Sequence, residues 1–71
     1  MDFVFYLADD SYLHLEFQST QGPEELARFM EYDVALYRKR HKTIQTYVVY
    51  GAGISDAPQV LNCGSINYQL Y

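Results

Sequence analysis

The segment 23–40 constrains the fold most, because it carries a full set of helix signals and lies between strand-like segments. Pro23 suits a first helical position, where its missing N–H is not needed. Acidic residues occupy the first turn and basic residues the last, as the helix dipole favours: Glu24, Glu25, Arg38, Lys39 and Arg40. Apolar residues recur at three- and four-residue spacing: Leu26, Phe29, Met30, Leu36 and Tyr37. The segment is predicted to be one helix of about five turns, with Asp33 facing solvent.

Strand patterns flank this helix on both sides. Residues 2–8 form an apolar, aromatic run, residues 11–18 alternate, and residues 43–51 are β-branched and aromatic. The order strand, helix, strand predicts a right-handed crossover between parallel strands, with the run Val48-Val49-Tyr50 buried on both faces. The chain is therefore expected to be a single α/β domain, residues 1–71. Its expected elements are a hairpin (2–18), a crossover helix (23–40), a third strand (43–51) and two short strands forming a small C-terminal hairpin (59–71).

Length and composition limit the function classes. A chain of 71 residues buries only about 60% of its unfolded surface, so its core is thin. Cys63 is the only cysteine, which excludes an internal disulfide and a cysteine-based zinc site, and it is interpreted as structural. No apolar run approaches the length of a membrane span, and no signal-peptide pattern is visible. These features favour a cytoplasmic protein without membrane contact.

The charge balance bears on nucleic-acid binding. The formal net charge is −4, whereas domains that grip phosphates are usually basic. Four of the five basic residues nevertheless fall in the stretch 38–42, "RKRHK". This stretch complements the dipole at the end of a helix, and it is also a candidate phosphate-binding patch.

The alternating segment 11–18 poses the main question about function. Leu13, Leu15 and Phe17 are predicted to form the core face of this strand. The opposite face carries Tyr12, His14, Glu16 and Gln18. That second face is either a solvated strand face or half of a metal site, with His14 expected to pack or to pair across strands.

The strings "DFVFYLADDSYLHLEFQ", "RFMEYDVALYRKRHK" and "YVVYG", in this order, resemble the PD-(D/E)XK nuclease core. The similarity is closest to the branch of recombination-promoting nucleases and transposase-associated proteins, and it covers roughly residues 2–51. The resemblance implies half of a restriction-endonuclease-like core, because the family's preceding helix and first strand have no counterpart here. The chain is therefore expected to be a truncated nuclease-like domain.

The resemblance also implies roles for individual residues. Asp2 matches the first acidic metal ligand and Glu16 the second, while Gln18 stands where the wider superfamily has a lysine. Such a site would hold Mg²⁺ or Mn²⁺ weakly, because two carboxylates leave most coordination positions to water. Gln18 can orient water or support a ligand, but it supplies no charge. The implied substrate is DNA, with Arg28, Tyr32, Arg38 and Arg40 as candidate residues on the substrate side.

Three functions remain open from the sequence. The first is a metal-dependent DNA endonuclease-like domain. The second is a non-catalytic interaction module that associates with itself or with a full-length relative, and the third is a remnant without a selected role. Twelve aromatic residues exceed what a thin core can bury, so a homodimer is expected, through strand edges or an aromatic surface in 3–6 or 66–71.

The metal-site hypothesis also predicts the hairpin register. A two-residue turn would separate Asp2 from Glu16 onto opposite faces of the strand pair. A three-residue loop or a bulge is therefore predicted, with Ala8 opposite Tyr12 and Asp2 opposite Gln18.

Overall fold

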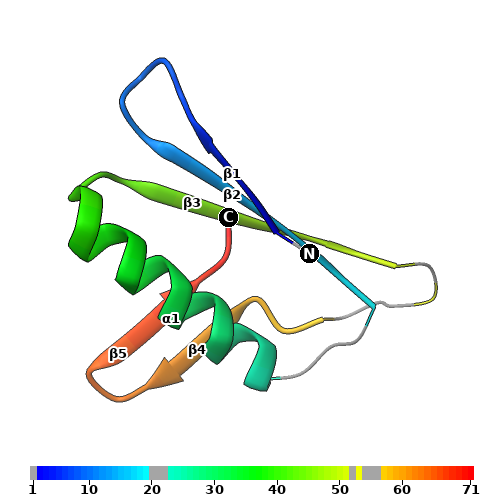
Figure 1. Cartoon of the computed structure of the whole chain (residues 1–71). Coiled ribbons are helices and arrows are strands. Elements are labelled where there is room, and N and C mark those ends of the chain that lie inside the picture. Colours follow the sequence, from blue (N-terminus) through cyan, green and yellow to red (C-terminus); the bar gives the residue numbers. More distant parts are fainter. Residues whose placement is uncertain (1, 20–22, 52, 54–56) are drawn as a thin grey trace.

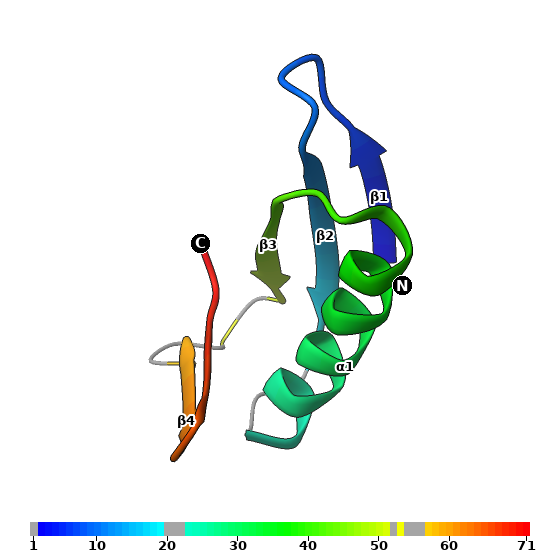
Figure 2. The same ribbon diagram turned by 90° about the vertical axis from the view of Figure 1, so that its left-hand side faces the viewer.

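Helix α1 (Pro23–Arg40) packs on one face of a three-stranded sheet in the computed structural model, which describes residues 2–19, 23–51, 53 and 57–71 (Figure 1). The sheet contains β1 (Asp2–Tyr6), β2 (Tyr12–Gln18) and β3 (Ile44–Tyr50), with β2 in the centre. Strand β2 is antiparallel to β1 and parallel to β3. A separate hairpin of β4 (Val60–Cys63) and β5 (Ile66–Gln69) follows (Figure 2). The predicted α/β architecture is confirmed, including the bounds of the helix.

The helix ends in a left-handed cap. His41 has a φ of 57°, and its N–H donates to the carbonyl of Tyr37 at 2.7 Å. This bond satisfies one of the carbonyls that the last helical turn leaves without a partner. Within the described part of the chain, α1 is not long and apolar enough to span a bilayer.

The hairpin joining β1 and β2 has the predicted three-residue loop but a different register. Leu7 donates to the carbonyl of Ser11 at 2.8 Å, which leaves Ala8, Asp9 and Asp10 in the loop. The pairs are Tyr6 with Tyr12 and Asp2 with Glu16, so the predicted pairs Ala8–Tyr12 and Asp2–Gln18 are wrong by two residues. Such loops place their third residue in the left-handed region, and this position falls on Asp10, with a φ of 72°. The predicted register would have put Ser11 there, and aspartate tolerates that conformation better than most residues.

The hydrophobic core lies between the helix and the face of the sheet that we call the inner face. This core consists of Leu26 and Phe29 of α1 and Leu70, which follows β5, with Val48, Leu61 and Tyr68 packed against them. The C-terminus is fastened to the sheet, since the N–H of Tyr71 donates to the carbonyl of Thr46 at 2.9 Å. The helix and the second hairpin therefore share the inner face.

The opposite face of the sheet, which we call the outer face, is apolar and exposed. The ladder pairs align eight positions on it: Phe3, Phe5, Leu13, Leu15, Phe17, Gln45, Tyr47 and Val49. The prediction that Leu13, Leu15 and Phe17 face the core is wrong, because the only helix among the described residues packs on the other side. The expected burial of 48–50 on both faces is wrong for the same reason, and Val49 is 47% exposed.

Candidate functional site

A buried imidazole forms the centre of the polar site beneath the helix. His14 of β2 is fully buried, and each of its ring nitrogens faces a carboxylate. Nδ1 lies 2.7 Å from Oδ1 of Asp33, on α1, and Nε2 lies 3.0 Å from Oε2 of Glu16, two residues along β2. The ring also contacts the ring of Tyr32, with 4.6 Å between their centroids. The strand and the helix are thus joined through one histidine.

Asp33 connects this histidine to two further elements. Its Oδ2 accepts hydrogen bonds from the Thr46 hydroxyl, on β3, and from the Tyr68 hydroxyl, on β5, the latter at 2.5 Å. Asp33 itself is only 8% exposed. In the described part of the chain, every buried side-chain nitrogen or oxygen has a hydrogen-bond partner. The network of Glu16, His14, Asp33, Thr46 and Tyr68 therefore ties together α1, β2, β3 and β5.

The geometry calls for a proton on both nitrogens of His14. A neutral imidazole has one donor and one acceptor, whereas the imidazolium donates from both nitrogens, as two facing carboxylates require. Burial alone lowers the pKa of His14, but the hydrogen bonds and charges of Asp33 and Glu16 outweigh it, so that the pKa is raised. Burial, followed by the bond to Asp33, raises the pKa of the Tyr68 hydroxyl far above its usual value, so this group stays a donor.

The three predicted site residues occupy neighbouring positions of the β1–β2 pair. Asp2 is the register partner of Glu16; its side chain lies outside the described residues. Glu16 is 8% exposed, and its Oε1 accepts a hydrogen bond from Nε2 of Gln18 at 3.3 Å. The strand face that carries Glu16 and Gln18 is therefore not the solvated face considered from the sequence, because the helix covers it.

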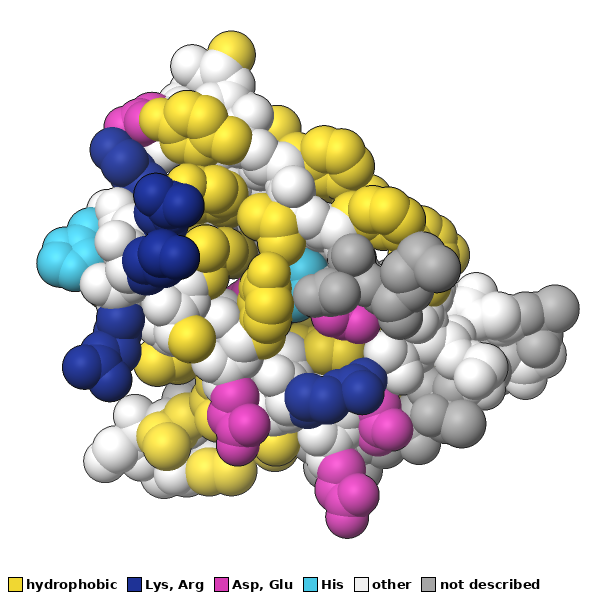
Figure 3. All heavy atoms as spheres, in the orientation of Figure 1, with side chains coloured by type: hydrophobic (Ala, Val, Ile, Leu, Met, Phe, Trp, Pro, Cys, Tyr) yellow, Lys and Arg dark blue, Asp and Glu magenta, His cyan; other side chains and the backbone are white. Residues whose placement is uncertain are grey.

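The candidate substrate-side residues divide into two groups. Tyr32 reaches the site, where its ring packs against His14. Arg28 is exposed on α1, with its guanidinium 5.4 Å from the centroid of the Phe29 ring. Arg38 and Arg40 are exposed in the last turn of α1, and basic side chains gather over that end of the helix (Figure 3). Among the described contacts, none joins these arginines to His14 or its hydrogen-bond partners.

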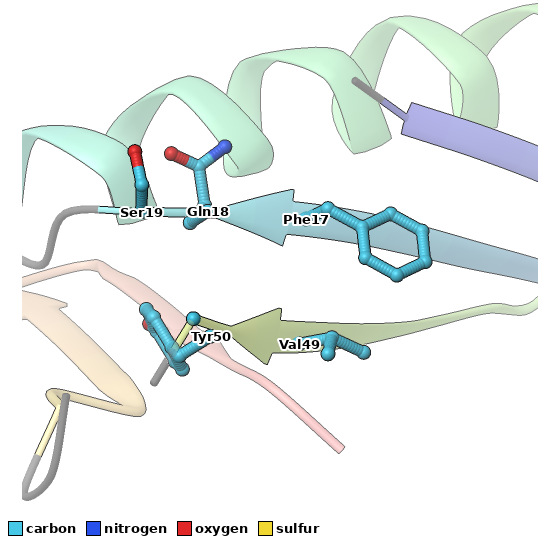
Figure 4. Close-up of a pocket in the computed structure, with 6 residues that line it drawn as sticks. Phe17, Gln18, Ser19, Val49 and Tyr50 are labelled. Carbon is cyan, nitrogen blue, oxygen red and sulfur yellow. The ribbon is translucent and has the colours of Figure 1, made fainter. Parts of the chain in front are cut away.

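A hollow of about 340 Å³ lies where the parallel strands β2 and β3 end (Figure 4). Its lining includes Phe17, Gln18, Ser19, Val49 and Tyr50. Gln18 and Ser19 point toward α1, while Phe17 and Val49 lie side by side on neighbouring strands. Gln18, whose Nε2 donates to Glu16, is the predicted site residue that lines this hollow.

The donor set decides which ions the site suits. Carboxylate and carboxamide oxygens at positions 2, 16 and 18 are ligands that hard divalent cations prefer. Glu16 already accepts from His14 and Gln18, but each carboxylate oxygen has two acceptor positions, so coordination remains open to it. Over the described ranges, no group of three or more His, Cys, Asp or Glu side chains is arranged to hold a metal ion.

Sequence reasoning missed three members of the network: Asp33, Thr46 and Tyr68. Asp33 was predicted to face solvent, and this prediction is wrong because the residue hydrogen-bonds to His14, Thr46 and Tyr68 beneath the helix. One signal was present: Asp33 follows Phe29 by four residues and Leu26 by seven, which places it within the buried stripe. A charge inside such a stripe indicates a buried partner of opposite charge. In the described part of the chain, His14 is the only buried residue of a basic type.

Comparison of the chain with protein-family models, with curated proteins and with solved structures gave no match. The site is therefore interpreted from its own geometry.

Proposed function

We propose that the chain is the metal-binding half of a nuclease core that cleaves phosphodiester bonds in DNA. The observation that carries this proposal is the ladder pair Asp2–Glu16, because positions directly opposite on antiparallel strands are separated by about 5 Å between their Cβ atoms. Gln18 adds a carboxamide that contacts Glu16. The order of hairpin, helix and parallel strand is also the one that the nuclease resemblance implies.

In this proposal Asp2 and Glu16 are the ligands of Mg²⁺ or Mn²⁺. A divalent cation at such a site supplies positive charge for a phosphate oxygen and for a bound water. The chain's own residues hold the ligands in place: His14 and Gln18 donate to the two oxygens of Glu16. The exposed Arg38 and Arg40 supply the charge for contacts to DNA phosphates, which the net charge of −4 otherwise opposes.

Mn²⁺ binding measured by calorimetry and by electron paramagnetic resonance tests the metal site. We expect weak binding by the natural chain, in the millimolar range, and at least a tenfold loss in Asp2→Asn and in Glu16→Gln. Glu31→Gln, at an exposed position on α1, is the matched control and should bind as the natural chain does. Circular dichroism of each variant separates loss of a ligand from loss of the fold.

Two results contradict the metal site. One is the absence of binding at 20 mM Mn²⁺, and the other is unchanged binding in both ligand variants, which would place the cation elsewhere. Nicking of supercoiled DNA with Mn²⁺ tests the chemistry separately. We expect any nicking to disappear in Asp2→Asn and to weaken in an Arg38→Gln, Arg40→Gln double variant.

A further inference from the structure

The outer face of the sheet has no covering layer among the described residues. Five residues of this face are between 40% and 47% exposed: Phe3, Phe5, Phe17, Tyr47 and Val49. Phe3 contacts both Phe5 and Phe17, with ring centroids 6.5 and 5.9 Å apart, so the three phenylalanine rings form one continuous patch. The Cα positions span 34 × 29 × 16 Å, a thickness that accommodates the sheet and one layer packed on it.

We propose that this outer face is the interface of a homodimer, in which the same face of a second copy covers it. The inference does not depend on metal binding or on nuclease activity. It rests on three properties of the face: its apolar area, its lack of charge and its place on a sheet, since sheets pack face to face.

The area is that of a small, weak interface. A large aromatic side chain contributes roughly 200 Å² of surface, so the exposed fractions of the five residues correspond to roughly 400 Å² on one face. The largest apolar patch on a monomer has about this area and is often functional. Two such faces would bury about 800 Å² together, which is the size of a weak, transient interface, so we expect a dissociation constant in the micromolar range or above.

The distribution of charge favours a second copy over a charged partner. The eight outer-face positions hold no Asp, Glu, Lys, Arg or His, and Gln45 is the only amide among them. Two chains with a net charge of −4 can therefore bring these faces together without opposing like charges in the contact. A basic or acidic partner would find no complementary group on this face.

The geometry of the sheet supports face-to-face packing. Two sheets pack with their strands about 30° apart and about 10 Å between layers, and their inner side chains interdigitate. A two-fold axis over the central strand β2 would place Leu15 near its own counterpart and Phe5 of one copy near the β3 side of the other. The resulting four-layer particle encloses both aromatic patches.

Light scattering coupled to size exclusion, between 5 and 200 μM, tests the proposal. We expect twice the chain mass of 8.3 kDa at the upper concentrations. Phe5→Lys and Phe17→Lys, both on the outer face, should each raise the dissociation constant at least about tenfold. Tyr37→Lys is the matched control, because Tyr37 is an exposed aromatic residue on α1, and this variant should dimerise as the natural chain does.

A cross-linking experiment makes the test independent of folding losses. In a Cys63→Ser background, which removes the exposed free thiol, Leu15→Cys should form a disulfide-linked dimer under mild oxidation, whereas Arg28→Cys on α1 should not. A monomer at 200 μM would overturn the proposal. A dimer that withstands both lysine substitutions would also overturn it, since the contact would then lie at a strand edge or on another surface.

Discussion

At the scale of single residues, His14 determines how the polar side of β2 can be buried. A fully buried imidazole between two carboxylates places two negative charges and one positive charge under the helix. Removing one partner from such a buried group is costly, because the remaining charges lose their compensation while staying out of water. The histidine thus allows Glu16 and Asp33 to be buried together.

His14→Asn tests this role through the pH dependence of stability in metal-free buffer. A histidine whose folded pKa is raised stabilises the fold fully below its unfolded pKa, about 6.5, and this contribution is lost as the pH rises through the higher folded value. At pH 6 we expect the variant to lose about 3 kcal/mol of unfolding free energy, or to be unfolded outright. At pH 9 the difference from the natural chain should be smaller.

Urea titrations at the two pH values provide the measurement, with His41→Asn as the control. His41 is exposed and has a positive φ that asparagine also adopts, so this variant should stay within about 0.5 kcal/mol of the natural chain. An equal loss in both histidine variants, or a loss in His14→Asn that grows toward pH 9, would contradict a protonated His14 between its carboxylates.

At the scale of elements, Asp33 fastens the C-terminal hairpin to the rest of the molecule. The hairpin β4–β5 belongs to a separate sheet and shares no ladder with β1–β2–β3. Apolar contacts of Leu61, Tyr68 and Leu70 hold it against the helix, and the bond from the Tyr68 hydroxyl to Asp33 adds a directional attachment. The phenol of Tyr68 thus adds a polar anchor to the apolar contacts that hold the hairpin.

Tyr68→Phe removes that attachment and keeps the ring. We expect a loss of about 2 kcal/mol, the usual contribution of a hydrogen bond to a charged group, measured as the free energy of unfolding in urea. Faster hydrogen exchange of the Tyr71 amide, which bonds to Thr46, should accompany it. Tyr71→Phe, at an exposed ring, is the control and should change neither quantity; similar behaviour of the two variants would show that the phenol of Tyr68 does not anchor the hairpin.

At the scale of the whole molecule, the burial of the two sheet faces is the reverse of that in an ordinary globular domain. Polar and ionisable side chains are buried beneath the helix, while most of the large aromatic residues of β1 and β2 are exposed on the other side. Among the described residues, the buried apolar core consists of Leu26, Phe29 and Leu70. In the proposed homodimer, association would supply driving force for folding that a core this small lacks.

Thermal unfolding at several concentrations tests this expectation. If a dimer unfolds to separate chains, each tenfold rise in protein concentration favours the folded dimer by about 1.4 kcal/mol. For a chain of this length, the midpoint of unfolding should rise by about 4 °C per tenfold. A midpoint that is constant from 5 to 200 μM would mean that each chain folds independently of a second copy.

The helix and the strands follow from the sequence, because the signals for these elements are local. A proline at the helix start, charged residues in the first and last helical turns, and alternation of apolar and polar residues in strands all act within a few residues. The helix Pro23–Arg40 and the order of the five strands could therefore be predicted closely. The three-residue loop was predicted from the metal-site hypothesis, which requires Asp2 and Glu16 on one face of the sheet. The register within that hairpin could not be predicted, because it depended on whether Asp10 or Ser11 took the left-handed position.

The tertiary structure alone decided which face of the sheet is covered and what His14 contacts. Alternation in 11–18 separates two sets of side chains, but it does not say on which side a helix will pack. The hydrogen bonds between His14 and Asp33, and from Thr46 and Tyr68 to Asp33, join residues that lie 13 to 35 positions apart along the chain. Such contacts arise from the packing of elements against one another, and a buried charge network can replace the apolar face when its members compensate each other's charge.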